Sequence, residues 1–74
     1  MRFSEDIREI RKKSLMSQEA FAQVLGVSFT TVNRWESGKT EPSYKALKTI
    51  QSFCEENNIE FKPEGYFEKE GSQG

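Results

Sequence analysis

The chain has 74 residues, of which 34% are hydrophobic and 31% are charged, so it predicts one small domain with a modest core. It has no histidine and one cysteine, Cys54, which excludes histidine-based catalysis, a zinc cluster and an internal disulfide. No apolar run approaches the roughly 20 residues that span a membrane, and no signal-peptide segment opens the chain, so we expect a cytoplasmic protein.

The net charge of −1 is unevenly distributed along the chain. Residues 1–54 carry nine Lys or Arg against six Asp or Glu, giving +3, and residues 55–74 carry two against six, giving −4. A mildly basic body followed by an acidic tail permits DNA binding without requiring it.

The first predicted helix covers residues 4–13, with Ser4 as its N-cap and lysines in its last turn, where they complement the helix dipole. Its buried stripe is expected to come from Ile7, Ile10 and either Leu15 or Met16. We expect Arg8, Lys12 and Lys13 to form a solvated face.

Two short helices joined at a glycine follow, and they are expected over residues 18–25 and 28–37. Ser17 and Ser28 are placed to accept hydrogen bonds from the unpaired N–H groups of the turn that follows each of them. Gly26 and Gly38 stand where each helix needs a left-handed residue to end. A helix, a short glycine-containing turn and a second helix are the sequence form of a helix-turn-helix.

The second of these helices has two chemically different sides. At about 100° per residue, Val32 and Trp35 point toward the core, and this position favours a structural role for Trp35 over a stacking role. The opposite side carries Phe29, Thr30, Asn33, Arg34 and Ser37. Their hydroxyl, amide, guanidinium and aromatic groups are able to touch base edges in a major groove.

A fourth helix is predicted from Ser43, its N-cap, to about Glu56, and Asn57-Asn58 is a suitable stop. Residues 59–62 then alternate at strand period, 63–65 offer a turn and 66–69 are able to return, which predicts a hairpin. Since a lone hairpin is marginally stable, it must pack on the helices, pair with another chain or stay mobile. Residues 71–74 are expected to be disordered.

The motif is dense enough to name a family. The chain resembles the Cro/C1-type (Xre-like) helix-turn-helix family over residues 4–56, through Ser17-Gln18-Glu19-x-Phe21-Ala22-x-x-Leu25-Gly26-Val27-Ser28, Thr31-Val32-x-Arg34-Trp35-Glu36-x-Gly38-Lys39 and Pro42-Ser43. The resemblance implies an all-α, compact four- to five-helix bundle of the lambda-repressor-like DNA-binding type, with a short extended or hairpin-like C-terminal tail. We expect the DNA-binding domain at residues 1–57 and a C-terminal extension at 58–74.

The resemblance also implies roles for individual residues. It puts base-facing side chains at Ser28, Phe29, Thr30, Asn33 and Arg34, and phosphate contacts at Gln18, Ser37, Lys39 and Thr40. It implies that Gln18 also braces the recognition helix, and that Arg11 and Glu36 form a partly buried ion pair. Phe29 departs from the polar residue that is frequent at its position. We hypothesise that its ring lies against thymine methyl groups, the alternative being that it folds back onto the core.

The leading functional interpretation is a sequence-specific DNA-binding repressor without enzymatic activity, metal, cofactor or small-molecule ligand. Because one recognition helix covers only a few base pairs, we expect a homodimer on an inverted repeat, with the fourth helix or the tail at the interface. The alternative is an antitoxin-like or other protein-interaction module whose acidic, aromatic tail adds to a partner's sheet edge.

Overall fold

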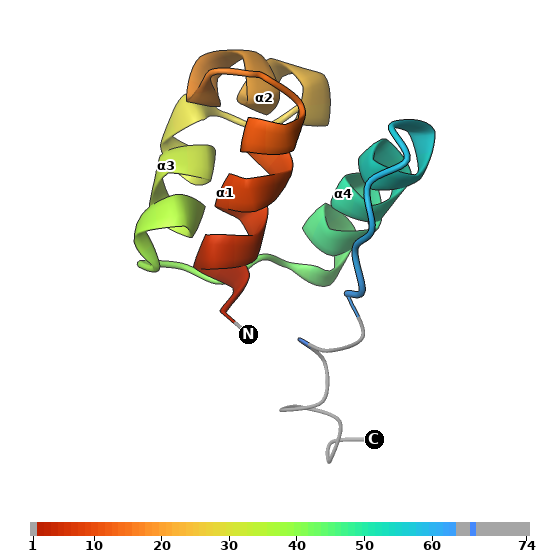
Figure 1. The fold of residues 1–74 in the computed structure, drawn as a ribbon. Helices are drawn as coiled ribbons and strands as arrows, with labels where there is room; N and C mark the ends of the chain where they lie inside the picture. Colours follow the sequence, from red (N-terminus) through yellow and green to blue (C-terminus); the bar gives the residue numbers. More distant parts are fainter. Residues whose placement is uncertain (1, 64–65, 67–74) are drawn as a thin grey trace.

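The computed structural model describes residues 2–63 and Tyr66, and within them it contains four α-helices and no strand. The helices are α1 (Phe3–Lys13), α2 (Gln18–Leu25), α3 (Phe29–Ser37) and α4 (Tyr44–Glu56). In Figure 1, α1, α2 and α3 form one group, α4 stands beside them, and the chain that leaves α4 turns back along that helix. The prediction of an all-α bundle is confirmed.

The ends of the last three helices follow the predicted capping chemistry. The hydroxyl groups of Ser17, Ser28 and Ser43 each accept a hydrogen bond, at 3.0–3.1 Å, from the backbone N–H three residues later. Gly26 and Gly38 close α2 and α3 in the left-handed region, with φ of 74° and 79°. These caps satisfy N–H groups that a helix leaves unpaired, so helix-turn-helix boundaries are set locally by sequence.

The start of α1 differs from its prediction. The helix begins at Phe3, its N-cap is Arg2, and no side chain caps it, so the prediction that Ser4 is the N-cap was wrong. The cause is a contact with a residue far along the chain. The ring of Phe3 is buried edge-on against Trp35, with 5.7 Å between ring centres. That packing holds the chain in helical conformation before Ser4 is reached.

The core is formed by one side of each helix. Its buried apolar side chains are Phe3, Ile7, Ile10, Phe21, Ala22, Leu25, Val32, Trp35, Leu47, Ile50, Phe53 and Cys54. The stripe of α1 is completed by Met16, which packs against this cluster, whereas Leu15 is 92% exposed in a left-handed turn. Burial raises the pKa of Cys54 to about 11, so its thiol stays protonated and packs as a small apolar group.

The described part of the segment after α4, residues 57–63 and Tyr66, packs on the helices and forms no strand. Residues 59–62 lack strand pairing, so the first half of the predicted hairpin is not formed, while 64–65 of the predicted turn, 67–69 and 71–74 lie outside the described residues. Ile59 and Phe61 pack against the core instead. Tyr66 places its ring edge-on to Phe3 at 5.3 Å, and its hydroxyl is hydrogen-bonded to Asp6. Apolar burial against helices replaces the hydrogen bonds that a hairpin would have supplied.

One buried carboxylate connects the first three helices. Glu36 on α3 is 4% exposed and is the buried charged residue of the described chain. The Nε and Nη2 atoms of Arg11 donate to its two oxygens at 2.7 and 3.1 Å, and Nε2 of Gln18 donates to Oε1 at 2.9 Å. The predicted ion pair between Arg11 and Glu36 is therefore present, and Gln18 of α2 extends it.

Arg8 was predicted to lie in a solvated face, but its side chain is hydrogen-bonded to α3. Its Nη2 donates to the backbone carbonyl of Glu36 at 3.0 Å, although half of the side chain remains exposed. A guanidinium near the last turn of α3 also complements the negative end of the helix dipole. Arg8 and Arg11, one turn apart on α1, thus hold the same residue of α3.

These contacts determine the charge state of Glu36. Burial alone would raise the pKa of its carboxyl group, but the hydrogen bonds from Arg11 and Gln18 and the positive charges of Arg11 and Arg8 outweigh burial and lower the pKa. Arg11 responds in the opposite sense, because its hydrogen bond to Glu36 raises its pKa. Both side chains are ionised at neutral pH.

Replacement of Trp35 by alanine should remove a large part of the stability of the domain. Loss of a buried aromatic ring typically costs about 3–5 kcal/mol, against a total of about 5–15 kcal/mol for a native domain. Urea unfolding followed by circular dichroism measures the change, and Arg34→Ala, one residue away on the exposed side, is the control. A Trp35→Ala protein as stable as the control would contradict the structural role.

Glu36 should make stability depend on pH in one direction. Because its folded pKa lies below the ordinary value of 4.5, its contribution is complete above that value and is lost as the pH falls through the folded pKa. Glu36→Gln should cost about 1.5–3 kcal/mol at neutral pH, the range for a hydrogen bond to a charged group.

The measurement is urea unfolding of wild type and Glu36→Gln from about pH 7 down to about pH 3. The difference in unfolding free energy between the two proteins should be constant at the upper end and shrink below the ordinary pKa of a glutamate. Glu41→Gln, at an exposed loop position, is the matched control. A difference that persists unchanged at the acid end would show that ionisation of Glu36 does not stabilise the fold.

Candidate nucleic-acid interface

The outward side of α3 holds the residues that were predicted to face bases. All five predicted base-facing residues are exposed, and so is the neighbouring Ser37: Ser28, Phe29, Thr30, Asn33, Arg34 and Ser37. Val32 and Trp35, on the other side, are buried. Half of the surface of Phe29 is accessible, so its ring is not folded into the core. The structure leaves the whole predicted base-facing set exposed, and contact of these residues with DNA stays a prediction.

The two serine hydroxyls on this face are already engaged locally. Ser28 Oγ caps α3 and lies 2.9 Å from the Thr31 hydroxyl, and Ser37 Oγ donates to the Arg34 carbonyl at 3.2 Å. Both therefore contribute to helix geometry. The longer side chains of Phe29, Asn33 and Arg34 extend farther from the helix axis and are better placed for an external partner.

Gln18 occupies a bridging position between α2 and α3. Its Nε2 donates to Glu36, and its Oε1 accepts a hydrogen bond from Asn33 Nδ2 at 3.3 Å. This is the bracing geometry that the family resemblance implied, while contact of Gln18 with a phosphate is untested. The bond to Asn33 was missed by the sequence reasoning, because no local pattern connects two polar residues that are 15 positions apart.

The two remaining predicted phosphate contacts lie in the loop that follows α3. Lys39 and Thr40 are both exposed, directly after Gly38. The backbone N–H of Lys39 donates to the Arg34 carbonyl at 3.0 Å, which closes the end of the helix. The backbone of the loop therefore starts from a fixed geometry, and the side chains of the loop extend from the end of α3.

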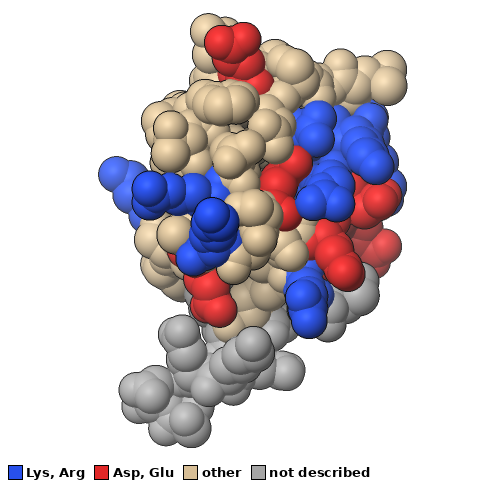
Figure 2. Space-filling model, turned by 90° about the vertical axis from the view of Figure 1, so that its left-hand side faces the viewer, with Lys and Arg blue, Asp and Glu red and all other residues tan. Residues whose placement is uncertain are grey.

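Charge is distributed around the α3 side in a pattern that suits a polyanion. α3 lies on the left of Figure 1, and Figure 2 shows that side facing the viewer. Lys and Arg side chains gather on both flanks of a central surface that carries few charges, with acidic side chains among them. Flanking cations match the position of phosphate strands, and a central surface of low charge matches the base edges between them.

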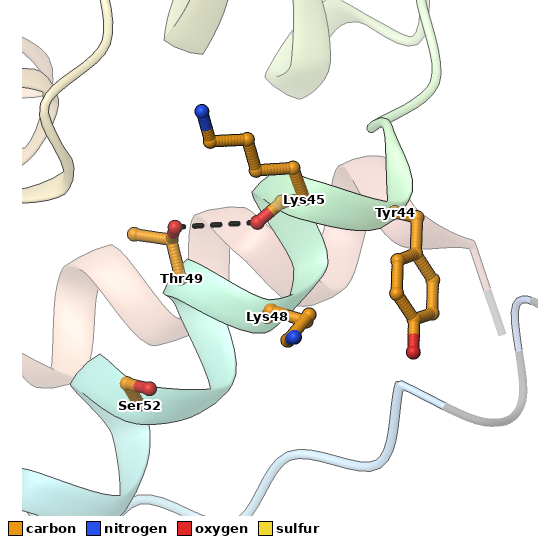
Figure 3. A pocket seen from close by; sticks show the side chains of 5 residues that line it. All are labelled: Tyr44, Lys45, Lys48, Thr49 and Ser52. Atoms are coloured by element: carbon orange, nitrogen blue, oxygen red, sulfur yellow. Dashed lines mark hydrogen bonds between the residues drawn. The ribbon is translucent and has the colours of Figure 1, made fainter.

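A separate hollow lies on the outer face of α4 (Figure 3). It has a volume of about 370 Å³ and is lined by Tyr44, Lys45, Lys48, Thr49 and Ser52. Thr49 Oγ1 donates to the Lys45 carbonyl, and Lys48 Nζ lies 5.8 Å from the centre of the Tyr44 ring. All five residues belong to one helix and are exposed, so the hollow is a surface depression apart from α3.

The described part of the chain has neither a metal site nor a membrane-spanning helix. Residues 2–63 and Tyr66 contain no group of three or more acidic or cysteine side chains that is arranged to hold a metal ion. None of the four helices in this part has the length and apolarity needed to cross a bilayer.

Comparisons with known proteins agree with this geometry. A family model described as "Helix-turn-helix" matches residues 7–57. The HTH-type transcriptional activator BcrR of Enterococcus faecalis is 40% identical over 53 residues, which cover 72% of this chain and 26% of that protein. The uncharacterized HTH-type transcriptional regulator YiaG of Escherichia coli strain K12 is 39% identical over 46 residues, which cover 62% of this chain and 48% of that protein.

A third relative has an enzyme's name. The type II methyltransferase M.SsoII of Shigella sonnei is 40% identical over 50 residues, which are 64% of this chain but 13% of the enzyme. The chain thus spans half or less of the length of each of these three curated relatives. No solved structure matches the chain. The family match and the motif on α2 and α3 show that the chain belongs to the Cro/C1-type (Xre-like) helix-turn-helix DNA-binding domain family.

Proposed function

We propose that the protein is a sequence-specific DNA-binding transcriptional repressor that acts in the cytoplasm and has no enzymatic activity. In this proposal it inserts α3 into the major groove of an inverted-repeat operator as a dimer. The observation that carries the proposal is the division of α3 into a clamped side and an exposed side. Trp35 and Glu36 fix the helix to the bundle, so Phe29, Asn33 and Arg34 keep a defined arrangement toward a partner.

Phosphate contacts would orient this face on the duplex. We assign them to Gln18, which donates a hydrogen bond to Glu36 of α3, to Ser37, the last residue of α3, and to Lys39 and Thr40 in the loop that follows. Contacts of this kind fix register and orientation, while side chains in the groove provide the sequence preference. The direction of regulation rests on the family resemblance, and one relative is named as an activator. A reporter gene placed behind the selected operator tests repression against activation.

Dimerisation is proposed through α4. Tyr44 is 65% exposed on its outer face, and aromatic side chains are enriched at protein interfaces. The tail is the weaker candidate, because Phe61 and Tyr66 already pack against the core of their own chain. The same packing argues against the alternative function, in which the tail aromatics would add to a partner's sheet.

Selection of duplexes from a random pool should yield an inverted repeat with half-sites about 34–36 Å apart, one helical turn, because two recognition helices must enter successive major grooves. Binding to the selected site should weaken with salt at a slope of about −0.9 in log K per log salt for each phosphate contact. A pure interaction module would show almost no slope. Recovery of no sequence, together with salt-independent retention, would sink the proposal. A selected site without symmetry would sink the dimer alone.

Phe29 should recognise thymine through its methyl group. Because the exposed ring is apolar, it gains by contact with the C5-methyl and gains nothing from uracil. Wild type should therefore bind a uracil-substituted site more weakly than its thymine twin, and Phe29→Ala should bind the two equally. Titration of both duplexes with both proteins measures this, with Val24→Ala, another exposed apolar residue, as the control. Equal binding of the two duplexes by wild type would exclude the methyl contact.

A further inference from the structure

The hydrogen bonds around Glu36 have a fixed polarity. An ionised carboxylate accepts hydrogen bonds and donates none, and the lowered pKa of Glu36 keeps it ionised at neutral pH. Arg11 donates to both of its oxygens, and Gln18, which makes the third hydrogen bond to this carboxylate, must also present a donor. The atom of Gln18 that faces Glu36 Oε1 at 2.9 Å is accordingly the amide nitrogen.

This choice propagates to the protein surface. With its nitrogen turned to Glu36, Gln18 turns its amide oxygen toward Asn33, one turn earlier on α3. This oxygen accepts a hydrogen bond from Asn33 Nδ2 at 3.3 Å. An exposed asparagine amide is otherwise free to rotate by 180°, because water can hydrogen-bond its oxygen and its nitrogen in either orientation. Here the buried charge, two hydrogen bonds away, selects one orientation of Asn33.

The selected orientation defines what Asn33 offers to a partner. One hydrogen of Nδ2 is used by Gln18, so the amide retains the second hydrogen as a donor and Oδ1 as an acceptor. In the major groove, adenine presents a donor at N6 beside an acceptor at N7, which this pair complements. Guanine presents two acceptors, so it satisfies the remaining Asn33 donor but leaves Oδ1 facing an acceptor.

We propose that Asn33 reads an adenine in the major groove, and that Gln18, held by Glu36, is the positioning residue that sets the orientation of the Asn33 amide. The inference rests on the proposed function. It adds the identity of one recognised base and the way in which the Asn33 amide is oriented before DNA binds. It assigns Gln18 a role in specificity, which differs from a phosphate contact because a phosphate contact strengthens binding to every sequence alike.

Random-pool selection on four proteins tests the assignment: wild type, Asn33→Ala, Gln18→Met and Gln23→Met. Gln23 is an exposed glutamine on the same helix as Gln18, so it controls for the chemistry of the substitution. Wild type and Gln23→Met should select an adenine at one half-site position. Asn33→Ala and Gln18→Met should both lose the preference at that same position and keep the others. A uniform loss of affinity in Gln18→Met, with the adenine preference intact, would overturn the positioning role.

A modified duplex gives a second readout that uses the wild-type protein. Replacing the selected adenine by 7-deazaadenine removes the N7 acceptor and should weaken wild-type binding about tenfold, within the range for one bidentate contact. Asn33→Ala should bind the two duplexes equally. Equal binding by wild type would overturn the adenine contact even if Gln18→Met failed to fold. Selection of a site in which Asn33 specifies another base would overturn the inference and leave the proposed function standing, whereas binding to no duplex would end both.

Discussion

The carboxylate of Glu36 is the constraint on which the rest of the arrangement depends. It is buried, so it must be fully hydrogen-bonded, and its partners come from α1 and α2. Removal of one partner from such a group leaves a charge without compensation, which is costly. The relative positions of three helices are thus tied to one side chain of the recognition helix. In the mechanism proposed above, binding and folding depend on the same residue, because Glu36 also orients Gln18 and, through it, Asn33.

Aromatic packing supports this polar centre from the other end of α1. Trp35 lies edge-on to Phe3, and Phe3 lies edge-on to Tyr66, so three rings connect α3, α1 and the segment after α4. Such contacts bury large apolar areas in a chain of modest core size. They also explain two departures from the sequence predictions, the early start of α1 and the lack of strand pairing in residues 59–62. Both depend on partners distant in the chain.

A rigid recognition helix makes the amide orientation of Asn33 meaningful. An exposed amide that flips freely offers both polarities to a base and discriminates little, whereas a fixed amide offers one pattern of donor and acceptor. Hydrogen bonds connect Arg11, Glu36, Gln18 and Asn33 in a continuous series from the core to the surface.

The sequence by itself determined the helix boundaries from residue 17 onward, because Ser17, Ser28 and Ser43 cap the turns beside them and the glycines end helices locally. It also determined which side of α3 is buried, since helical periodicity alone separates Trp35 from Asn33. Only the tertiary structure decided the start of α1, the path after α4, the bond from Arg8 to the α3 carbonyl and the link between Gln18 and Asn33. Those features join residues far apart in the chain, and their energies exist only once the helices have packed.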